Sequence, residues 1–404
     1  MFKKRTRLFS HFNLINFFHI LKAFLYKNKN FKNELKTYLK TDNIELTSQG
    51  RTALYDIIKQ IVLTTGKKII HISPYTIPEV IYAIRYAGAE VNYIDINKFT
   101  GLINEDLLEK EINERTAAVL ITHLYSTQDH IKNFFKRFEG KILVIEDAAI
   151  NFGAQIDNKY LGTIGDYGFF SFNLVKNLNT LNGGAIYIRD KNLFKNYIES
   201  RKVSPFPIGN SISLLITNLI IKILSNNYIY QFFHYLLILI YKKKSSFFLK
   251  KIYPINFHKY YSTVPKNYSY DFNWLMNDIG SYNLKRVNLN YSERIKKAAL
   301  YSKLINNDCA TKFNYSFKDN ALLEYPIILK KITNKDLQSK LMNEGYDIRL
   351  TWYINNVENE EKVSNHKFSD TKFIEKYIFC LPLHKNINAK DIHNISSLIN
   401  KLAS

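Results

Sequence analysis

A single lysine interrupts the stretch FFSFNLVKNLNTLNGGAIYI, residues 169–188, in which Lys176 is the only charged side chain. It is either a solvated lysine in a surface loop or an amine held in a pocket for covalent chemistry. Asp147 and Ser171 each lie at the end of an apolar run that is typical of a strand. Upstream, Gly50-Arg51-Thr52 begin a run with helical periodicity, and the N–H groups at a helix N-terminus suit a phosphate. These residues together offer an amine, a carboxylate, a hydroxyl and an anion-binding turn.

The elements that must position these residues alternate along the chain from about residue 46 to residue 190. Strand patterns cover residues 68–73, 91–95, 118–122, 142–146, 168–172 and 185–189. Amphipathic helix patterns such as TALYDIIKQIVLTT and PEVIYAIRYAGA lie between the early strands. This alternation predicts an α/β fold with a mainly parallel sheet covered on both faces. Ligands in such sheets bind beyond the carboxyl ends of the strands, which is where Asp147 lies.

The rest of the chain divides by composition and periodicity. The expected segments are a basic N-terminal extension (1–45), a large domain (46–199), a basic apolar insertion (200–270) and a connecting helix with a small C-terminal α+β domain (271–404). Residues 273–305 have helical periodicity. The small domain is expected to contain the strand LEYPIIL and the helices NKDLQSKLMNEG and NAKDIHNISSLINKL. The sequence shows no internal repeat, metal-ligand cluster or P-loop.

Pyridoxal phosphate (PLP) requires each of the groups around Lys176: a lysine for its aldehyde, donors for its phosphate and a carboxylate for its ring nitrogen. Spacing alone does not identify this cofactor, because any α/β protein carries such residues. The motifs do more. In order they are GRTAL, PYTIPEV, AGAEVNYIDIN, ERTAAVLITHLYS, VIEDAAINFGA, LGTIGDYGFFSFNLVKN, NGGAIYI and LPLHKNINAKDI. With these motifs the chain resembles the DegT/StrS family of PLP-dependent sugar aminotransferases.

The resemblance implies the fold-type-I architecture, with a mainly parallel seven-stranded sheet and a homodimer with cofactor sites at its interface. Lys176 would bind the cofactor aldehyde and move the substrate proton, and Asp147 would pair with the pyridinium nitrogen. The remaining cofactor contacts implied by the family are Gly50, Arg51, Thr52 and Ser171 at the phosphate, Tyr75 at the ring, and Asn273 reaching the partner's phosphate. An unpaired lysine that is also partly desolvated has a lowered pKa and can attack as the free base.

Some positions depart from the family pattern. Ile150 stands where the family has Gln or His, with Asn151 beside it, and the usual GEGG reads LNGG. Leu275 replaces an arginine, and Ile77 replaces an aromatic residue, which leaves Tyr75 as the substitute. These departures concern the substrate pocket. His123 and Tyr125 are further pocket candidates, which strand-end packing explains equally well. Arg349 is a candidate for the carboxylate of the amino donor, although the sequence favours an exposed ion pair, and His384 is expected to be structural.

The resemblance implies transfer of an amino group from an amino acid, L-glutamate, to a nucleotide-linked keto-sugar in surface-polysaccharide or related glycan synthesis. A dehydratase type in the family has histidine where this chain has Lys176, so the lysine favours the aminotransferase. An alternative function is a membrane-surface binding or regulatory protein that kept the PLP fold and lost turnover. Ile150 and LNGG favour that alternative, whereas the retained Lys176, Asp147 and Ser171 oppose it.

The net charge of +22 is concentrated in two segments. Residues 1–33 hold eight Lys/Arg, residues 200–270 hold ten, and neither segment contains Asp or Glu. Both are also rich in large apolar residues, which favours an anionic membrane surface over nucleic acid. Buried helices, for instance at a dimer interface, are the alternative. Polar residues interrupt both segments, so neither has an apolar run long enough to span a membrane. The interruptions near the N-terminus also argue against a signal peptide.

The two cysteines, Cys309 and Cys380, have no disulfide or metal-ligand spacing and fit a reducing compartment. The sequence therefore predicts a cytoplasmic enzyme, peripheral on the inner face of a membrane through residues 1–33 and 200–270.

Overall fold

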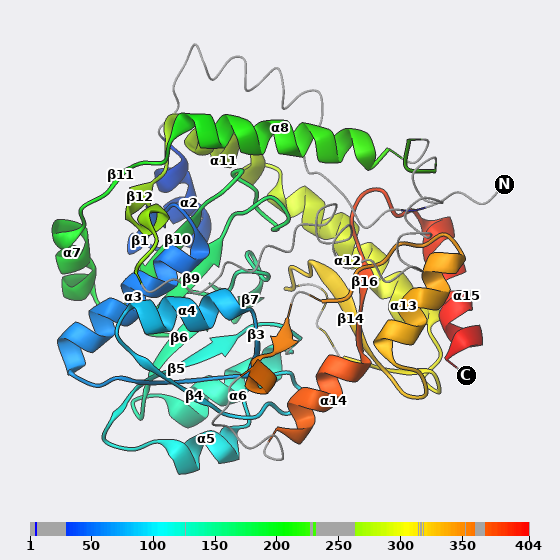
Figure 1. Cartoon of the computed structure of the whole chain (residues 1–404), viewed down its shortest axis with the longest axis horizontal. Helices are drawn as coiled ribbons and strands as arrows, with labels where there is room; N and C mark the ends of the chain where they lie inside the picture. Colours follow the sequence, from blue (N-terminus) through cyan, green and yellow to red (C-terminus); the bar gives the residue numbers. More distant parts are fainter. Residues whose placement is uncertain are drawn as a thin grey trace.

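The computed structural model describes residue 5 and residues 30–403, except 126, 227–228, 232–262, 314, 316, 318, 352 and 360–367. Within these residues the chain forms a large and a small domain (Figure 1). The first predicted membrane segment, residues 1–33, and the second half of the other, residues 232–262, fall almost wholly outside the described residues.

The large domain is built on a seven-stranded sheet in the order β1-β10-β9-β6-β5-β2-β4. Its strands are β1 (Ile44–Thr47), β2 (Ile69–Ile72), β4 (Glu90–Tyr93), β5 (Thr116–Thr122), β6 (Leu143–Asp147), β9 (Tyr167–Ser171) and β10 (Gly184–Ile188). Only β10 runs antiparallel to its neighbours, β9 and β1. The four pairings from β9 to β4 are parallel, so their carboxyl ends share one edge. The predicted fold class is confirmed.

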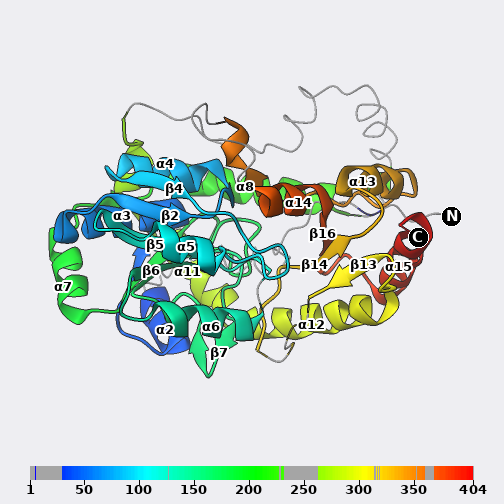
Figure 2. The ribbon, with the colours of Figure 1, turned by 90° about the horizontal axis from the view of Figure 1, so that it is seen from below.

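Helices cover both faces of this sheet, as the view in Figure 2 shows for α3 and α4 on one side and α2, α6 and α11 on the other. The large-domain helices are α2 (Phe31–Leu39), α3 (Gly50–Thr65), α4 (Pro78–Tyr86), α5 (Glu105–Glu111), α6 (Gln128–Phe138), α7 (Lys191–Ser200) and α11 (Trp274–Leu284). Alternate strand residues point to the two faces, so Phe169 packs under α3 and Phe170 packs under α2 and α11. Both faces of the sheet carry a large apolar core, as expected for a sheet buried on both sides.

The small domain packs helices against a three-stranded antiparallel sheet in the order β13-β14-β16. Its elements are α12 (Val287–Leu304), β13 (Ala310–Lys312), β14 (Glu324–Leu329), α13 (Asn334–Asn343), α14 (Ser369–Tyr377), β16 (Ile378–Pro382) and α15 (Ala389–Leu402). A capping box at Asn388 and Asp391 starts α15. The buried Arg5 guanidinium lies 2.8 Å from the same Asp391 carboxylate and so attaches this point of the N-terminal segment to the small domain.

Several short elements join the two domains or extend the large one. They are β3 (Tyr75–Thr76), β15 (Ile354–Asn355), the hairpin β7 (Gln155–Ile156) and β8 (Lys159–Tyr160), β11 (Ser204–Pro205), β12 (Tyr270–Asp271), and the 3-10 turns η1 (Lys266–Ser269) and η2 (Asn356–Asn359). β15 pairs antiparallel with β3 and thereby carries the small-domain chain onto the large domain. Asn356 reinforces this crossing, because its Nδ2 donates to the carbonyls of Pro74 and Thr76.

The insertion between the domains begins with one long helix, α8 (Ile208–Leu224), which runs along α11 at the edge of the molecule (Figure 1). Its inner face buries Ser211, Leu215 and Asn218. At its carboxyl end, Asn386 of the small domain donates to the Ser225 carbonyl over 3.3 Å. None of the helices in the described part of the chain is long and apolar enough to cross a membrane.

The six predicted strands all exist, each within two residues of its expected bounds, whereas β1 was not predicted. The periodic region 273–305 is two helices rather than one, because the chain turns between Leu284 and Val287. Residues 31–47, mostly within the predicted N-terminal extension, contribute α2 to the core and β1 to the edge of the main sheet.

Candidate active site

The carboxyl ends of β6 and β9 bring Asp147 and Ser171 to one edge of the sheet. The two strands pair in parallel, with Asp147 opposite Phe169, two residues before Ser171. Asp147 is 4% exposed, and its Oδ1 accepts a hydrogen bond from the Ala149 N–H over 3.0 Å. Ser171 is half-buried. The strand-end placement predicted from the sequence is therefore observed for both residues.

The N-terminus of α3 lies directly against Ser171. A Cβ atom on Gly50 would come within 2.9 Å of the Ser171 Cβ and 3.1 Å of the Phe170 carbonyl oxygen, so only glycine fits there. No side chain caps α3 at Gln49, which leaves first-turn N–H groups to bind an anion. Thr52 is buried, and its hydroxyl oxygen lies 3.3 Å from that of Ser48. The start of α3 thus lies against the end of β9, and the binding of a phosphate by Gly50, Thr52 and Ser171 stays a prediction.

Two glycines after the lysine loop make this close approach possible. A Cβ on Gly184 would lie 2.6 Å from the Gly50 nitrogen, and Gly183 has a φ of +141°, which favours glycine. The glycine pair of the LNGG motif therefore serves backbone packing at the start of α3. Leu181 begins the same motif with a φ of +73°, a left-handed conformation that costs a non-glycine residue about 1 kcal/mol.

The loop that carries Lys176 is fixed by the two asparagines that follow it. Asn177 is buried, donates to the carbonyls of Ile150 and Ala321, and accepts from the guanidinium of Arg294. Asn179 donates to the Leu174 carbonyl and accepts from the Leu181 N–H. Arg294 lies on α12 and Ala321 just before β14, so residues of the C-terminal part of the chain help to hold the lysine loop in place. The sequence alone gave no reason to single out these asparagines.

Burial lowers the pKa of the Lys176 amine to about 8. The negative charge of Asp147 opposes this shift, Arg349 adds to it, and Glu324 opposes it. The structure records no hydrogen bond or ion pair of the Lys176 amine among the described residues. A pKa near 8 leaves a substantial fraction of free amine at neutral pH, which covalent attack on a carbonyl carbon requires.

Burial also raises the pKa of the Asp147 carboxyl, against the Ala149 N–H and the charges of Lys176 and His123. A buried carboxylate of this kind gains from a cationic partner, which a protonated pyridine nitrogen provides. His123 itself is fully buried, and its Nε2 lies 2.8 Å from the Glu146 carboxylate. Glu146 also accepts three backbone N–H groups, from Gly162, Ile164 and Gly165. His123 is therefore part of a structural network rather than a pocket residue.

The small domain places three further polar residues at this edge. Burial and, after it, the negative charge of Asp147 raise the pKa of Tyr353, so this buried tyrosine lies within electrostatic reach of the carboxylate. Arg349 donates from Nε and Nη2 to the Glu324 Oε1 over 2.9 and 2.8 Å, and both charges act on Lys176. Arg349 thus forms an ion pair, as the sequence favoured, but the pair is partly buried rather than exposed. Tyr353 and Glu324 were missed, since no motif marks them.

Two of the residues predicted to contact the cofactor, Tyr75 and Asn273, are packed or hydrogen-bonded within this chain. Tyr75 is fully buried, with ring centroids 6.5 Å from Tyr125 and 5.9 Å from Tyr353. Asn273 caps α11 and is committed within its own chain, accepting from Met276 N and donating to the Phe206 carbonyl and the Ser211 hydroxyl. Ring stacking by Tyr75 and phosphate binding across a dimer by Asn273 stay predictions.

The departures from the family pattern have structural partners. Leu181 of LNGG and Leu275, in place of the family arginine, form one apolar cluster with Leu215 of α8 and Ile279. Their substitution therefore creates the docking site of the inserted helix. Ile150 packs against the small-domain core, and the side chain of the neighbouring Asn151 donates to the His123 carbonyl.

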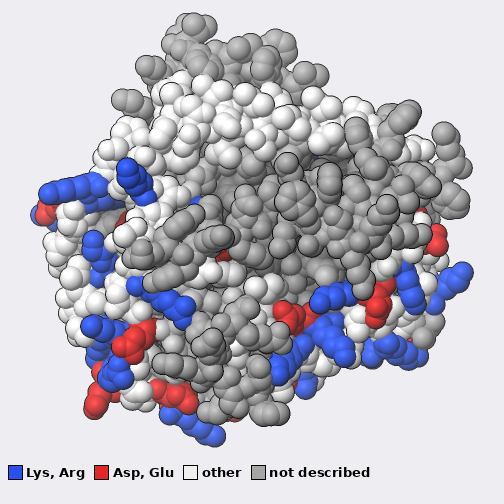
Figure 3. Space-filling model, in the orientation of Figure 1, with Lys and Arg blue, Asp and Glu red and all other residues white. Residues whose placement is uncertain are grey.

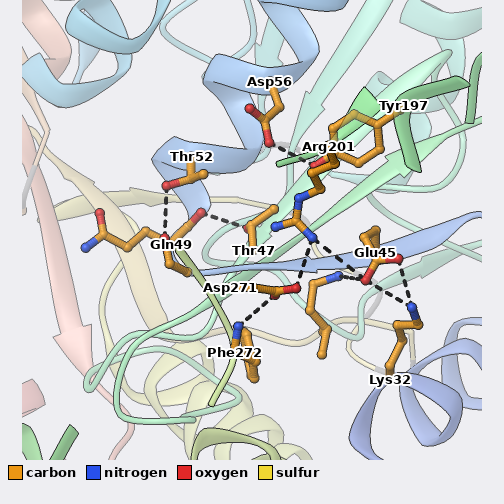
Figure 4. Close-up of polar contacts among 12 residues, drawn as sticks. Lys32, Glu45, Thr47, Gln49, Thr52, Asp56, Tyr197, Arg201, Asp271 and Phe272 are labelled. Atoms are coloured by element: carbon orange, nitrogen blue, oxygen red, sulfur yellow. Dashed lines mark hydrogen bonds and ion pairs between the residues drawn. The ribbon is translucent and has the colours of Figure 1, made fainter. Parts of the chain in front are cut away.

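Behind α3, a buried charge network joins four elements of the large domain (Figure 4). Arg201 lies 3.2 Å from Asp271 and 4.0 Å from Glu45. The Tyr197 hydroxyl donates to Asp56 over 2.8 Å, and burial raises the pKa of Asp56 to about 6. This network connects β1, α3 and the residues after α7 with β12. It positions the start of α3 rather than contributing groups to the site.

PLP fits these residues on two structural observations. Gly50 allows the start of α3 to pack directly against Ser171, so the uncapped first turn of the helix and the hydroxyl-bearing strand end lie together, as phosphate binding requires. A lysine of lowered pKa and a buried carboxylate lie at the same strand edge and act on each other electrostatically. The structure therefore brings together Lys176, Asp147, Gly50, Thr52 and Ser171, and their roles toward the cofactor stay predictions.

A family model covers most of the chain. The DegT/DnrJ/EryC1/StrS aminotransferase family matches residues 25–204 and 253–400. The match omits residues 205–252, which include α8, so this helix lies outside the family pattern.

Curated relatives match a shorter part of the chain. It is 30% identical over 148 residues to GDP-perosamine synthase of Escherichia coli O157:H7, covering 36% of this chain and 40% of the relative. It is 28% identical over 172 residues to GDP-4-keto-6-deoxy-D-mannose 3-dehydratase of Yersinia pseudotuberculosis, covering 41% and 44%. The matched part thus spans about two fifths of the length of these relatives.

Solved structures match almost the whole chain. A structure of GDP-4-keto-6-deoxymannose-3-dehydratase with bound GDP-perosamine has a TM-score of 0.72 at 18% identity, covering 98% of this chain and 100% of that one. An aminotransferase of Helicobacter pylori involved in pseudoaminic acid biosynthesis has a TM-score of 0.72 at 16% identity, covering 99% of both chains. These identities establish the fold alone.

The resemblance seen in the sequence motifs is thus confirmed by the family model, and the fold by the solved structures. The chain belongs to the PLP-dependent DegT/DnrJ/EryC1/StrS aminotransferase family, which confirms the enzyme class and the cofactor predicted from its sequence.

Proposed function

We propose that this protein is a sugar aminotransferase that moves an amino group from L-glutamate to the keto group of a nucleotide-linked sugar. The observation that carries the proposal is the Lys176 amine, held in a fixed loop with its pKa lowered to about 8 beside Asp147. Relatives named as a GDP-perosamine synthase and a UDP-sugar transaminase support a nucleotide-linked substrate. Relatives named as 3-dehydratases share the fold, and Lys176 is the residue that favours amino transfer here.

The chain's own residues would divide the work as follows. Ser171 and the Gly50-Arg51-Thr52 turn at the start of α3 would bind the PLP phosphate, and Lys176 would hold the cofactor covalently. Asp147 would keep a proton on the ring nitrogen. When bound, PLP supplies an electron sink for the electrons released at the substrate carbon. The Lys176 Nζ, once displaced from the cofactor, would carry the proton from the donor carbon and later return one to the sugar carbon.

The reaction would proceed in two halves, because amino acid and keto-sugar use the same site in turn. We place this enzyme in surface-polysaccharide or related glycan synthesis and as a homodimer. Relatives in perosamine and pseudoaminic acid synthesis support the first statement. The dimer rests on the family resemblance.

Absorbance spectra test the proposal directly. The purified protein should show the visible band of lysine-bound PLP, and Lys176→Ala should abolish it. L-Glutamate alone should bleach the band in a half-reaction, and the keto-sugar should restore it. If the variant kept the wild-type spectrum, the assignment of Lys176 would be wrong.

The second function, binding or regulation without turnover, was motivated by Ile150 and LNGG. The structure gives the LNGG departure a packing role against α8, which weakens that motive. PLP bound without a half-reaction for any amino acid in a panel would favour this second function.

We further propose that the enzyme works in the cytoplasm on the inner face of a membrane. The acid-free basic segments 1–33 and 200–270 support this location, each Lys/Arg near anionic lipid contributing about 1 kcal/mol.

A further inference from the structure

The helix α8 carries an apolar face on each of two sides. One side, centred on Leu215, packs on Leu181 and Leu275 of the body. The other side exposes Ile208, Ile212, Ile216, Ile220 and Ile223, which are between 36% and 57% exposed. At 100° per residue these five side chains form one stripe about 120° wide. A soluble helix normally presents polar residues on its outer face, so this stripe requires an explanation.

The orientation of the stripe is fixed by the fold. Leu181 and Leu275, the two departures from the family pattern, receive the inner face of α8. Buried Asn218 and the contact of Ser225 with Asn386 hold the rest of the helix. Because these contacts prevent rotation of α8 about its axis, the isoleucines remain on the outer face. Figure 3 shows an uncharged surface along the edge where Figure 1 places α8.

The composition of the stripe and of the segment around it indicates that a lipid surface, rather than another protein, contacts this face. The exposed stripe consists of isoleucine alone, whereas protein interfaces are enriched in aromatic residues and arginine. The segment 200–270 contains ten Lys/Arg and no Asp or Glu, and apart from Arg201, which is buried in ion pairs, these nine positive charges are of the kind that an anionic lipid surface attracts. α8 has 17 residues, fewer than the about 20 that span a bilayer, and its inner face already packs on protein.

We propose that the isoleucine stripe of α8 is a membrane-docking face that inserts into the interfacial region of an anionic lipid surface. The helix would lie in the plane of the membrane, with its inner face still on Leu181 and Leu275. This inference rests on the location proposed above and gives that location a defined surface. It does not depend on the aminotransferase reaction.

Flotation with vesicles tests the docking face. Full-length protein is mixed with phosphatidylglycerol–phosphatidylcholine vesicles or with phosphatidylcholine vesicles at low salt. The wild type should float with the anionic vesicles, less with the neutral ones, and less at high salt. Ile216→Glu/Ile220→Glu should lower the partition coefficient by roughly tenfold or more, because two inserted apolar side chains become charged.

A matched control separates the helix from the change in charge. Leu63→Glu/Leu289→Glu introduces the same two charges at leucines that are 75% and 69% exposed on α3 and α12. This control should float like the wild type. A second variant, Ile216→Ser/Ile220→Ser, should lose flotation without any charge change. The visible PLP band, measured in every sample, reports folding and the cofactor site independently of lipid.

Three outcomes would overturn the proposal. The first is that the wild type fails to float with anionic vesicles at low salt. The second is that the two glutamate double variants float to the same extent. In the third outcome, the α8 variants float normally but convert a dimer to a monomer in light scattering, which identifies the stripe as an interface between copies. Loss of the PLP half-reaction with normal flotation would instead count against the proposed function alone.

Discussion

A Cβ atom on Gly50 would lie 2.9 Å from the Cβ of Ser171. The first residue of α3 and the last residue of β9 are therefore so close that no side chain fits on Gly50. This contact brings the helix N-terminus to the hydroxyl that is predicted to share the PLP phosphate with it. A methyl group at Gly50 would separate the two by forcing the helix or the strand to shift, since real Cβ atoms do not approach this closely.

Gly50→Ala should therefore weaken PLP binding about tenfold or more, equivalent to about 1.4 kcal/mol, with the fold retained. Titration of the apo-protein with PLP, followed by the visible band, measures the effect. Gly209→Ala is the matched control, because a Cβ there meets nothing within 4 Å. Equal affinities in the two variants would show that the phosphate binds elsewhere.

The lowered pKa of Lys176, about 8, predicts how the apo-protein takes up PLP. Only the free amine attacks the aldehyde, so the rate of covalent uptake should rise about tenfold between pH 7 and pH 9 and level off above it. An ordinary lysine would give a rate still rising at pH 10. Stopped-flow absorbance of the visible band gives the profile, and a midpoint near 10.5 would contradict the buried-amine argument.

The ion pair between Arg349 and Glu324 should tune that midpoint in opposite directions. Arg349 lowers the pKa of Lys176 and Glu324 raises it, so Arg349→Met should move the midpoint to higher pH and Glu324→Gln to lower pH. The same uptake profile measures both variants. Unchanged midpoints with normal folding would show that the pair acts only as a structural contact between Arg349 and Glu324 of β14.

Asp56 should make the stability of the large domain depend on pH. Burial raises its pKa from 3.8 to about 6, opposed by the Tyr197 hydroxyl and the Arg201 charge. Because the folded-state pKa is the higher one, the contribution of Asp56 to stability is present below about pH 4 and is lost as the pH rises to about 6. The shift corresponds to about 3 kcal/mol.

Asp56→Asn removes this ionisation and keeps an oxygen to accept from Tyr197. The free energy of unfolding of the variant relative to wild type should therefore increase from pH 4 to pH 7. Urea unfolding across this range measures the difference. Asp308→Asn, at an exposed position, is the control. A difference that stays constant with pH would show that Asp56 does not ionise between these values.

The sequence predicted most of the sheet because β5, β6, β9 and β10 are mainly apolar runs of five or more residues, and the shorter β2 and β4 stand in a clear alternation with amphipathic helices. β1 escaped because Ile44–Thr47 is short and carries Glu45, whose charge is neutralised by Lys32 only in the fold. Motifs identified Lys176 and Asp147, whose spacing is set by consecutive strand ends. Tyr353 and Glu324 could not be found in this way, since the small domain brings them to the site from distant sequence positions.

The docking of α8 was also hidden in the sequence, because LNGG and Leu275 read as losses from the family pattern. Only the packing of Leu181 and Leu275 against Leu215 shows that the insertion and the departures belong together. The apolar composition of the insertion was visible, but not which of its residues face the body.

The pairing of β15 with β3 has a consequence for how the protein matures. Asn356 bonds to the Pro74 carbonyl across 282 positions of sequence, and Asn177 beside the lysine bonds to the Ala321 carbonyl across 144. During synthesis the sheet can assemble early, but the lysine loop lacks its second anchor until the small domain has left the ribosome. A nascent chain should therefore capture the cofactor late, after translation of the C-terminal domain, and chains truncated before residue 353 should form the sheet without a complete site.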